Sequence, residues 1–265
     1  MAAVETAGSA VKADQIVIRK LEGIEELRSA VALQKEVWGF SDAELIPLRM
    51  FVVAQKIGGQ TVGAFDDREM VGFLLAIPGN RHGHLYLHSH MMGVRDAYRN
   101  YGLGRRLKLF QRQDAIERGI ELIEWTFDPL EIKNAFLNLE RLGAIARRYN
   151  INQYGTTSSP LHGGLPSDRL MAEWWVNSKR AQLVASGETH PPVNAETRIR
   201  VPAEIYDWKS RPETRDRARQ VLERTRAAFL ENFGRGLAAL GYERDAEGNG
   251  TFLLGKWEED FSYLR

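Results

Sequence analysis

The hydrophobic and polar positions of the chain repeat with two periods, one typical of strands and one typical of helices. Alternating or continuous apolar segments rich in β-branched residues predict strands over 15–20, 57–66, 70–77, 85–94 and 120–127. Apolar positions at helical spacing predict helices over 25–38, 104–119 and 131–142. Gly39 and Gly143 follow the first and last of these helices, as C-terminal caps do.

Turn residues divide this half of the chain into units. Asp66-Asp67-Arg68 predicts a hairpin between the second and third strands, so we expect those strands to be antiparallel. Pro78-Gly79-Asn80 is expected to close that unit. Pro47 to Val53 is apolar and is expected to form a short helix or an irregular segment.

The C-terminal half contains fewer regular segments. Strands are predicted over 144–149, 169–177 and 198–202, with a long polar loop over 150–168 and a connection over 178–196. Ser210-Arg211-Pro212 is expected to open a long helix, with apolar positions through Leu240, that Gly241 ends. Residues 242–244 and 251–254 are expected to form a closing hairpin.

The strand at 85–94, the helix at 104–119 and the strand at 120–127 have the spacing of a βαβ unit, so their strands are expected to be parallel neighbours. Between the first strand and the helix lies Arg99-Asn100-Tyr101-Gly102-Leu103-Gly104, an R-x-x-G-x-G pattern. Its glycines permit positive φ and close backbone approach, and a helix begins directly after it. Such a loop binds an anion, most naturally a pyrophosphate, and Arg99, Arg105 and Arg106 add positive charge.

Composition limits the classes of function. The chain has 265 residues, of which 43% are hydrophobic and 27% charged, as in ordinary globular proteins. Its net charge of +1 does not support a basic nucleic-acid surface. The absence of cysteine excludes disulfides, thiolate metal sites and a cysteine nucleophile. Residues 1–14 are expected to be a disordered tail with no secretory signal, and the apolar runs are too short to cross a membrane, so a cytoplasmic protein is expected.

With these motifs the chain resembles the GNAT superfamily of acyl-CoA-dependent N-acyltransferases. The resemblance covers residues 15–178 and is tightest over 88–143. Further matching segments indicate a less-studied branch with a C-terminal extension over 179–265: Asp128-Pro129, Asn134-Ala135, Asn138-Leu139, 141–144, Tyr149, Tyr154-Gly155 and 164–169. The resemblance implies an α/β fold, a mixed β-sheet with helices on both faces, and a helix-hairpin extension packed on it.

The resemblance also implies roles for particular residues. Backbone N–H groups of Asn100, Tyr101, Gly102, Leu103 and Gly104 would hold the CoA pyrophosphate. Met92 and Val94 would pair through their backbones with the pantetheine arm, as in strand addition, and the N–H near Met92 could polarise the thioester carbonyl. Asn134 would contact the cofactor.

The implied reaction is direct attack of a primary amine on acyl-CoA. The acyl group would be acetyl or another short group such as succinyl, which some relatives transfer, and the acceptor a small molecule such as an amino acid. No nucleic acid or membrane partner is expected. The extension would complete the sheet, cover the acceptor site or form a homodimer contact; the residues leave these three roles open.

One position departs from the family pattern. Many members carry a tyrosine four residues before the glycine that ends the second helix, and it protonates the leaving thiolate. Here that position is Leu139. Another group then gives the proton, or the thiolate leaves unassisted, or catalysis is weak. Tyr149 and Tyr154 are the nearest candidate replacements.

Four histidines cluster around the strand at 85–94. His88 and His90 are two residues apart, so strand alternation places them on one face, with Met92. His90 is the candidate base or substrate contact; a core or rim histidine with a hydrogen-bond partner is the plainer interpretation. A metal site from His82, His84, His88 and His90 would lack a carboxylate, so no metal is predicted. Glu124 and Glu173 are expected to be solvated or salt-bridged strand residues.

Two further functions remain as hypotheses. A non-catalytic CoA-binding or regulatory module would keep the fold without the acid at position 139. A small-molecule binding protein that does not use CoA would tolerate changes in the R-x-x-G-x-G loop.

Overall fold

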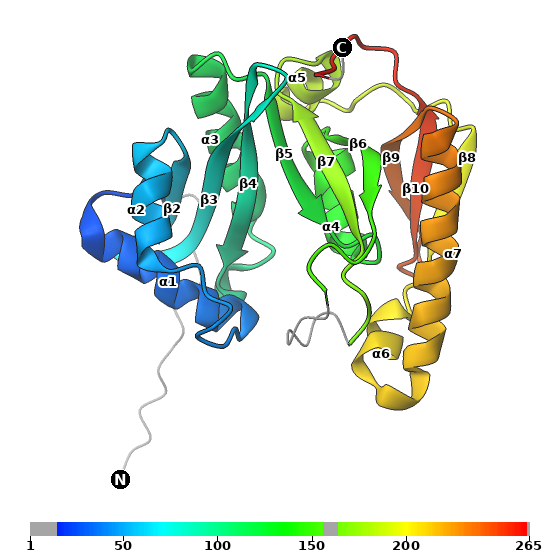
Figure 1. Cartoon of the computed structure of the whole chain (residues 1–265), viewed down its shortest axis with the longest axis horizontal. Coiled ribbons are helices and arrows are strands. Elements are labelled where there is room, and N and C mark those ends of the chain that lie inside the picture. The colour runs from blue at the N-terminus through cyan, green and yellow to red at the C-terminus, as the bar shows by residue number, and fades with distance from the viewer. Residues whose placement is uncertain (1–14, 156–163, 264–265) are drawn as a thin grey trace.

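The computed structural model describes residues 15–155 and 164–263. Ten strands form one mixed sheet in the order β1-β2-β3-β4-β5-β7-β6-β9-β10-β8 (Figure 1). The strands are β1 (Val17–Lys20), β2 (Gln60–Asp66), β3 (Glu69–Arg81), β4 (His84–Val94), β5 (Leu122–Phe127), β6 (Ile145–Asn150), β7 (Arg169–Trp175), β8 (Thr197–Val201), β9 (Leu237–Arg244) and β10 (Gly250–Lys256). The neighbours β4 and β5 are parallel, as predicted, and the other pairs are antiparallel.

Helices cover both faces of the sheet, which confirms the predicted fold class. The helices are α1 (Gly23–Trp38), α2 (Leu48–Lys56), α3 (Leu103–Glu117), α4 (Ile132–Phe136), α5 (Lys179–Ser186), α6 (Ile205–Ser210) and α7 (Arg215–Gly234), with a π-helical turn η3 (Leu137–Arg141) after α4. α1 and α2 pack on one face around Phe51, Phe73 and Leu75. α3 packs on the other face through Leu103 and Leu107. No helix among the described residues is long and apolar enough to cross a membrane.

Strands of the C-terminal extension continue the same sheet. β9 joins β6 through the pair Ala146 and Ala239, and β10 and β8 follow in order. α7 lies along these strands, where Phe229 contacts Phe252 edge-on with ring centroids 5.0 Å apart (Figure 1). Of the three roles considered for the extension, the structure shows completion of the sheet.

The first hairpin unit is longer than the sequence predicted. β3 continues through Pro78-Gly79-Asn80, and the turn lies instead at His82 and Gly83, which have φ values of 52° and 86°. β2 begins at Gln60, opposite Ala76, so beyond Ala76 one edge of β3 pairs with no strand among the described residues. A proline is tolerated there because its missing N–H interrupts no ladder on the open edge.

Other boundaries in the second half also differ from prediction. The connection over 178–196 contains α5, whose N-cap Ser178 accepts a hydrogen bond from the Ala181 N–H at 3.2 Å. α7 ends at Gly234, and Leu237 to Leu240 belong to β9 rather than to the helix. A nearly continuous apolar run fits a strand buried on both faces as well as it fits a helix, and Gly236, with a φ of 80°, ends the helical backbone.

Two predicted helices are each divided. The helix expected over 131–142 consists of α4 and the π-helical turn η3. The long helix was expected to open at Ser210, but α6 ends at that residue. A short 3₁₀ turn follows α6, and the long helix, α7, begins only after this turn. The predicted tail over 1–14 and the middle of the loop over 150–168 lie outside the described residues.

Candidate functional site

β4 and β5 pair over a short distance and then separate. Their register contains Leu87 opposite Ile123 and His88 opposite Glu124. Beyond these residues the strands diverge toward their C-terminal ends (Figure 1). We call this region, Ser89–Val94 of β4 and Trp125–Phe127 of β5, the β4/β5 split. The edge of β4 that faces the split is therefore not used by β5 and can accept another extended chain.

A β-bulge lies in β4 inside the split. Leu75 of β3 is opposite Met91 and Ala76 is opposite Ser89, so His90 is the extra residue. The bulge shifts the alternation: Met91 packs in the cluster under α1 and α2, whereas Met92 packs in the cluster under α3. The prediction that Met92 shares a face with His88 is therefore wrong, because strict alternation does not survive an inserted residue.

The R-x-x-G-x-G turn follows β4 and ends at the first turn of α3. Asn100 and Gly102 have φ values of 68° and 75°, the left-handed conformation that asparagine and glycine adopt most readily. Gly102 is the N-cap of α3; it offers no side chain to the N–H groups of the first helical turn, which also contains no acidic residue. These N–H groups and the helix dipole are the elements of an anion site.

Leu103 and Gly104 fix this turn against its neighbours. Leu103 is 1% exposed and anchors α3 in the core. A Cβ on Gly104 would lie 3.4 Å from the Met92 Cε and 4.0 Å from the Leu137 Cδ2. The start of α3 is thus flanked by β4 on one side and by η3 on the other.

The three arginines of the loop differ in their contacts. Arg99 lies exposed in the turn, with an ion pair of 2.7 Å to Asp96. Arg105 donates to the carbonyl of Arg141 at 3.1 Å and to that of Val184 at 2.7 Å. Arg106 donates to the carbonyl of Ile16 at 2.6 Å. The Arg105 and Arg106 contacts tie α3 to neighbouring segments, so Arg99 is the arginine placed within the turn itself.

The remaining predicted cofactor contacts lie around this turn. Tyr101 is exposed within it, and Met92 and Val94 are partly buried on β4. Asn134 is exposed on α4, three residues before the Leu137 that flanks Gly104.

One of the histidines, His88, lies beside a buried carboxylate. His88 Nδ1 is 4.0 Å from Glu124 Oε1, and the His88 and His90 rings are 6.3 Å apart. Burial, followed by the proximity of His88, lowers the pKa of His90. His84 stacks on Tyr263 at 4.4 Å. In the part of the chain that the structure describes, no group of three His, Cys, Asp or Glu side chains is arranged to hold a metal ion.

Glu124 belongs to a charge cluster that sequence analysis did not assemble. Arg81 and Arg148 donate to its carboxylate at 2.9 and 2.7 Å. Glu173, opposite Glu124 on β7, accepts from Arg147 and Arg148. Burial by itself would raise the pKa of Glu124, but the hydrogen bonds from His88, Arg81 and Arg148 outweigh it and lower the pKa to about 2. Both glutamates are salt-bridged and buried.

The two tyrosines proposed as proton donors have different surroundings. The Tyr149 hydroxyl donates to Asp168 at 2.7 Å, and burial together with that carboxylate raises the pKa of Tyr149. Tyr154 is 46% exposed, and its hydroxyl is 3.1 Å from the Thr126 hydroxyl on β5. Leu139, at the family's tyrosine position, is fully buried in the core.

Lys108 is a further residue that sequence analysis did not single out. It is 3% exposed on α3, at the closed end of the β4/β5 split. Its spacing could have revealed it, because residues 104, 108, 111 and 115 lie on one face of the helix and Gln111 and Ala115 are fully buried.

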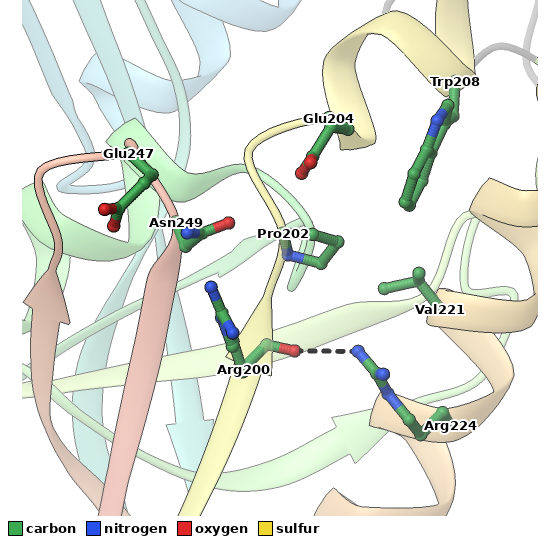
Figure 2. Close-up of a pocket in the computed structure, with 8 residues that line it drawn as sticks. All are labelled: Arg200, Pro202, Glu204, Trp208, Val221, Arg224, Glu247 and Asn249. Atoms are coloured by element: carbon green, nitrogen blue, oxygen red, sulfur yellow. Dashed lines mark hydrogen bonds between the residues drawn. The ribbon is translucent and has the colours of Figure 1, made fainter.

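A pocket of about 450 Å³ lies apart from the split, between β8, α6, α7 and the end of β10 (Figure 2). Its lining carries charges of both signs on exposed side chains, and Arg224 donates to the Arg200 carbonyl at 3.1 Å. None of the predicted site residues lines this pocket.

Comparisons with known proteins give a family match and solved structures of similar fold. Residues 25–143 match the acetyltransferase (GNAT) family. The ribosomal-protein-S18-alanine N-acetyltransferase of Escherichia coli is similar in structure, with a TM-score of 0.50, 16% identity, and coverage of 62% of this chain and 95% of that one. A putative GNAT acetyltransferase of Desulfovibrio desulfuricans has a TM-score of 0.48 and 15% identity, over 61% of this chain and 99% of that one. At 16% and 15% identity, these similarities show a shared fold and nothing further.

No curated protein matches the sequence. The family match covers the α1-to-η3 segment, which contains the bulged β4, the glycine turn and the β4/β5 split. Residues 25–143 of the chain therefore form an acetyltransferase domain of the GNAT family.

Proposed function

We propose that this protein transfers a short acyl group from acyl-CoA to the primary amine of a small molecule. One observation carries the proposal: the edge of β4 beyond its pairing with β5 leads directly to a helix N-terminus that no side chain among the described residues caps. An extended arm with an anion at one end fits that combination, and acyl-CoA has this form. The acyl group is acetyl or succinyl, and an amino acid is the acceptor we favour.

In this proposal the turn holds the pyrophosphate. Backbone N–H groups from Asn100 to Gly104 surround it, with Arg99 as the nearby cation. Arg105 supports the site by binding the carbonyls of Arg141 and Val184, which fixes the first turn of α3. Asn134, exposed on α4, contacts the cofactor from the other side.

The pantetheine arm pairs with the backbone of β4 near Met92 and Val94. An N–H at this bulged segment polarises the thioester carbonyl and stabilises the oxyanion that forms when the amine attacks. The bulge at His90 contributes to this arrangement, because the extra residue changes the direction of the β4 backbone groups within the split.

His90 is the candidate base in this reaction. Its pKa is lowered, so the imidazole is neutral at pH 7 and can accept a proton from the incoming ammonium, directly or through water. Tyr154 is the tyrosine better placed to exchange a proton, because its hydroxyl is exposed. The Tyr149 proton is held by Asp168, which favours a structural role for that residue.

The buried Leu139 supports a second candidate, a CoA-binding module without catalytic activity. Leucine stands at the position where many family members carry the tyrosine that protonates the thiolate. Thiol release separates the two functions. The purified protein is incubated with acetyl-CoA or succinyl-CoA and a panel of amino acids and other primary amines. Amine-dependent thiol release supports the enzyme, whereas CoA binding without release from either donor supports the module.

A further inference from the structure

Lys108 lies where β4 and β5 part. Its Nζ donates to the Ser89 hydroxyl of β4 at 2.8 Å and lies 3.7 Å from the ring centroid of Trp125 on β5. Ser89 and Trp125 directly follow His88 and Glu124, the last residues that pair. Lys108 therefore bridges the two strands at the closed end of the β4/β5 split.

The contacts of Lys108 are those of a protonated amine. Its Nζ also donates to Gln111 Oε1 at 3.1 Å, so a hydroxyl, an amide oxygen and an aromatic face match the three N–H groups of an ammonium. A neutral amine would instead turn its lone pair toward one of these electron-rich groups. Within residues 15–155 and 164–263, no carboxylate forms an ion pair with this side chain.

The neighbouring charges are directed elsewhere. Asp114, on the same helix, is held by Lys20, Gln60 and Arg118. His88 and Glu124 point to the opposite face of the sheet, because strand neighbours alternate.

Of the other titratable groups on these elements, His90 lies in the bulge of β4, and Arg112 on α3 donates to the Val176 carbonyl. Burial lowers the pKa of Lys108 well below its ordinary value, whereas the three contacts of its Nζ match the protonated form, so its ammonium releases a proton more readily than that of an exposed lysine.

A second buried donor lies beside Trp125. The Trp125 indole N–H donates to Asn138 Oδ1 at 3.3 Å, which fixes the orientation of that amide. Asn138 Nδ2 is buried and has no hydrogen-bond partner among the described residues. Asn138 lies in η3, and π-helical turns of this kind occur often at functional sites. Two donor groups thus flank Trp125 on the face of the sheet that α3 covers.

A buried cation without a counter-ion is unfavourable unless an anion forms beside it. We infer that Lys108 stabilises and protonates the CoA thiolate as it leaves, with Asn138 as a neighbouring donor. This inference rests on the proposed function, in which the arm of acyl-CoA enters at Gly102 and follows β4 inward toward Ser89. It gives the protein a proton donor although Leu139 occupies the usual tyrosine position.

The step balances in atoms and charge. The amine nitrogen of the acceptor forms a bond to the thioester carbon and loses one proton to water or to His90. The tetrahedral intermediate then breaks its C–S bond, and the electron pair goes to sulfur. Lys108 Nζ gives that sulfur the proton that faces the Trp125 ring, the weakest of its three acceptors, which yields CoA thiol and a neutral lysine. The proton that left the amine returns to Lys108 through solvent before the next turnover, so that the acceptor of that proton and Lys108 both regain their starting forms.

Calorimetric titration of the full chain with CoA and with desulfo-CoA, which lacks the sulfur, isolates this contact. We expect the wild-type protein to prefer CoA by about tenfold, the factor that one hydrogen bond to a charged group supplies. Lys108→Met should abolish the preference and leave the affinity for desulfo-CoA within twofold of wild type. Lys56→Met, at an exposed position on α2, is the control and should keep the preference.

Methionine has a similar shape, so Lys108→Met should fold, which thermal unfolding checks; Lys108→Gln serves as a second neutral variant if it does not. A folded neutral variant that still prefers CoA overturns the inference alone, as does a wild-type protein that binds the two compounds equally. A wild-type protein that binds neither compound contradicts the proposed function itself and removes the inference with it.

Discussion

The Tyr149 hydroxyl donates a hydrogen bond of 2.7 Å to a carboxylate oxygen of Asp168. The same carboxylate is fully buried and accepts both a backbone N–H from Asn152 and a bidentate pair from Arg226 of α7. Strand β6, the loop before β7 and the extension therefore meet at Asp168. We interpret Tyr149, which keeps this carboxylate satisfied, as a structural residue.

Tyr149→Phe tests that interpretation. The variant should lose about 1.5 kcal/mol of unfolding free energy, because one hydrogen bond to a charged group disappears while the other bonds to Asp168 remain. Denaturant unfolding measures the loss, and thiol release from acyl-CoA should continue at a rate within a few-fold of wild type. A normal stability with abolished turnover would instead make Tyr149 the proton donor.

The ion pair between Arg226 and Asp168 should hold α7 on the sheet. Arg226→Met leaves the buried carboxylate with fewer partners and should lower the unfolding free energy by roughly 3 kcal/mol. Arg219→Met, on the same helix but with an ion pair at an exposed position, should change it by less than about 1 kcal/mol. Equal effects from the two variants would show that Asp168 does not anchor the extension.

Glu124 should make the stability dependent on pH in the acid range. Its folded-state pKa of about 2 is below the ordinary value, so its contribution is present above about pH 4.5 and is lost as the pH falls toward 2. In wild type this contribution amounts to up to about 3 kcal/mol. Glu124→Gln should be less stable at pH 7, and the difference should shrink as the pH approaches 2. A constant difference over this range would contradict the predicted titration.

His90 should affect the pH profile of turnover. Because its pKa is lowered, the rate should stay high below pH 6.5 and fall only at more acid values. His90→Asn should lower kcat and remove this fall in rate at acid pH, the acid limb of the profile. Stopped assays at a series of pH values, with the amine that supports turnover as the acceptor, would record both changes. A variant with an unchanged profile would assign the acid limb to another group.

Sequence patterns located the elements that hold the candidate donor site, but they did not show how the elements meet. The βαβ unit and its glycine turn were predictable because strand alternation, helical spacing and turn residues are local properties. The bulge at His90 was not, since an inserted residue shows only in the pairing with β3. The Glu124 cluster and the position of Lys108 depend on side chains from distant elements, so only the fold brings them together.

The extension shows a different limit. Leu237 to Leu240 fits a helix by composition, and only its pairing with β10 distinguishes a strand. Likewise, the hydrogen-bonding partners of Arg105 could not be inferred from a position beside the glycine turn, because its acceptors are carbonyls of η3 and α5.

The most direct test of the proposed donor site is CoA binding by a variant of Gly102. Gly102 has a φ of 75° and open space where a Cβ would lie, and Gly187, the C-cap of α5, has a φ of 93° and equally open space. Aspartate at either position meets similar backbone strain, but only at 102 does it place a negative charge at the start of α3. Calorimetry should show CoA binding by wild type and by Gly187→Asp, and a loss of at least about tenfold in Gly102→Asp. Undiminished binding of CoA by Gly102→Asp, or no binding by wild type at millimolar CoA, would contradict the account.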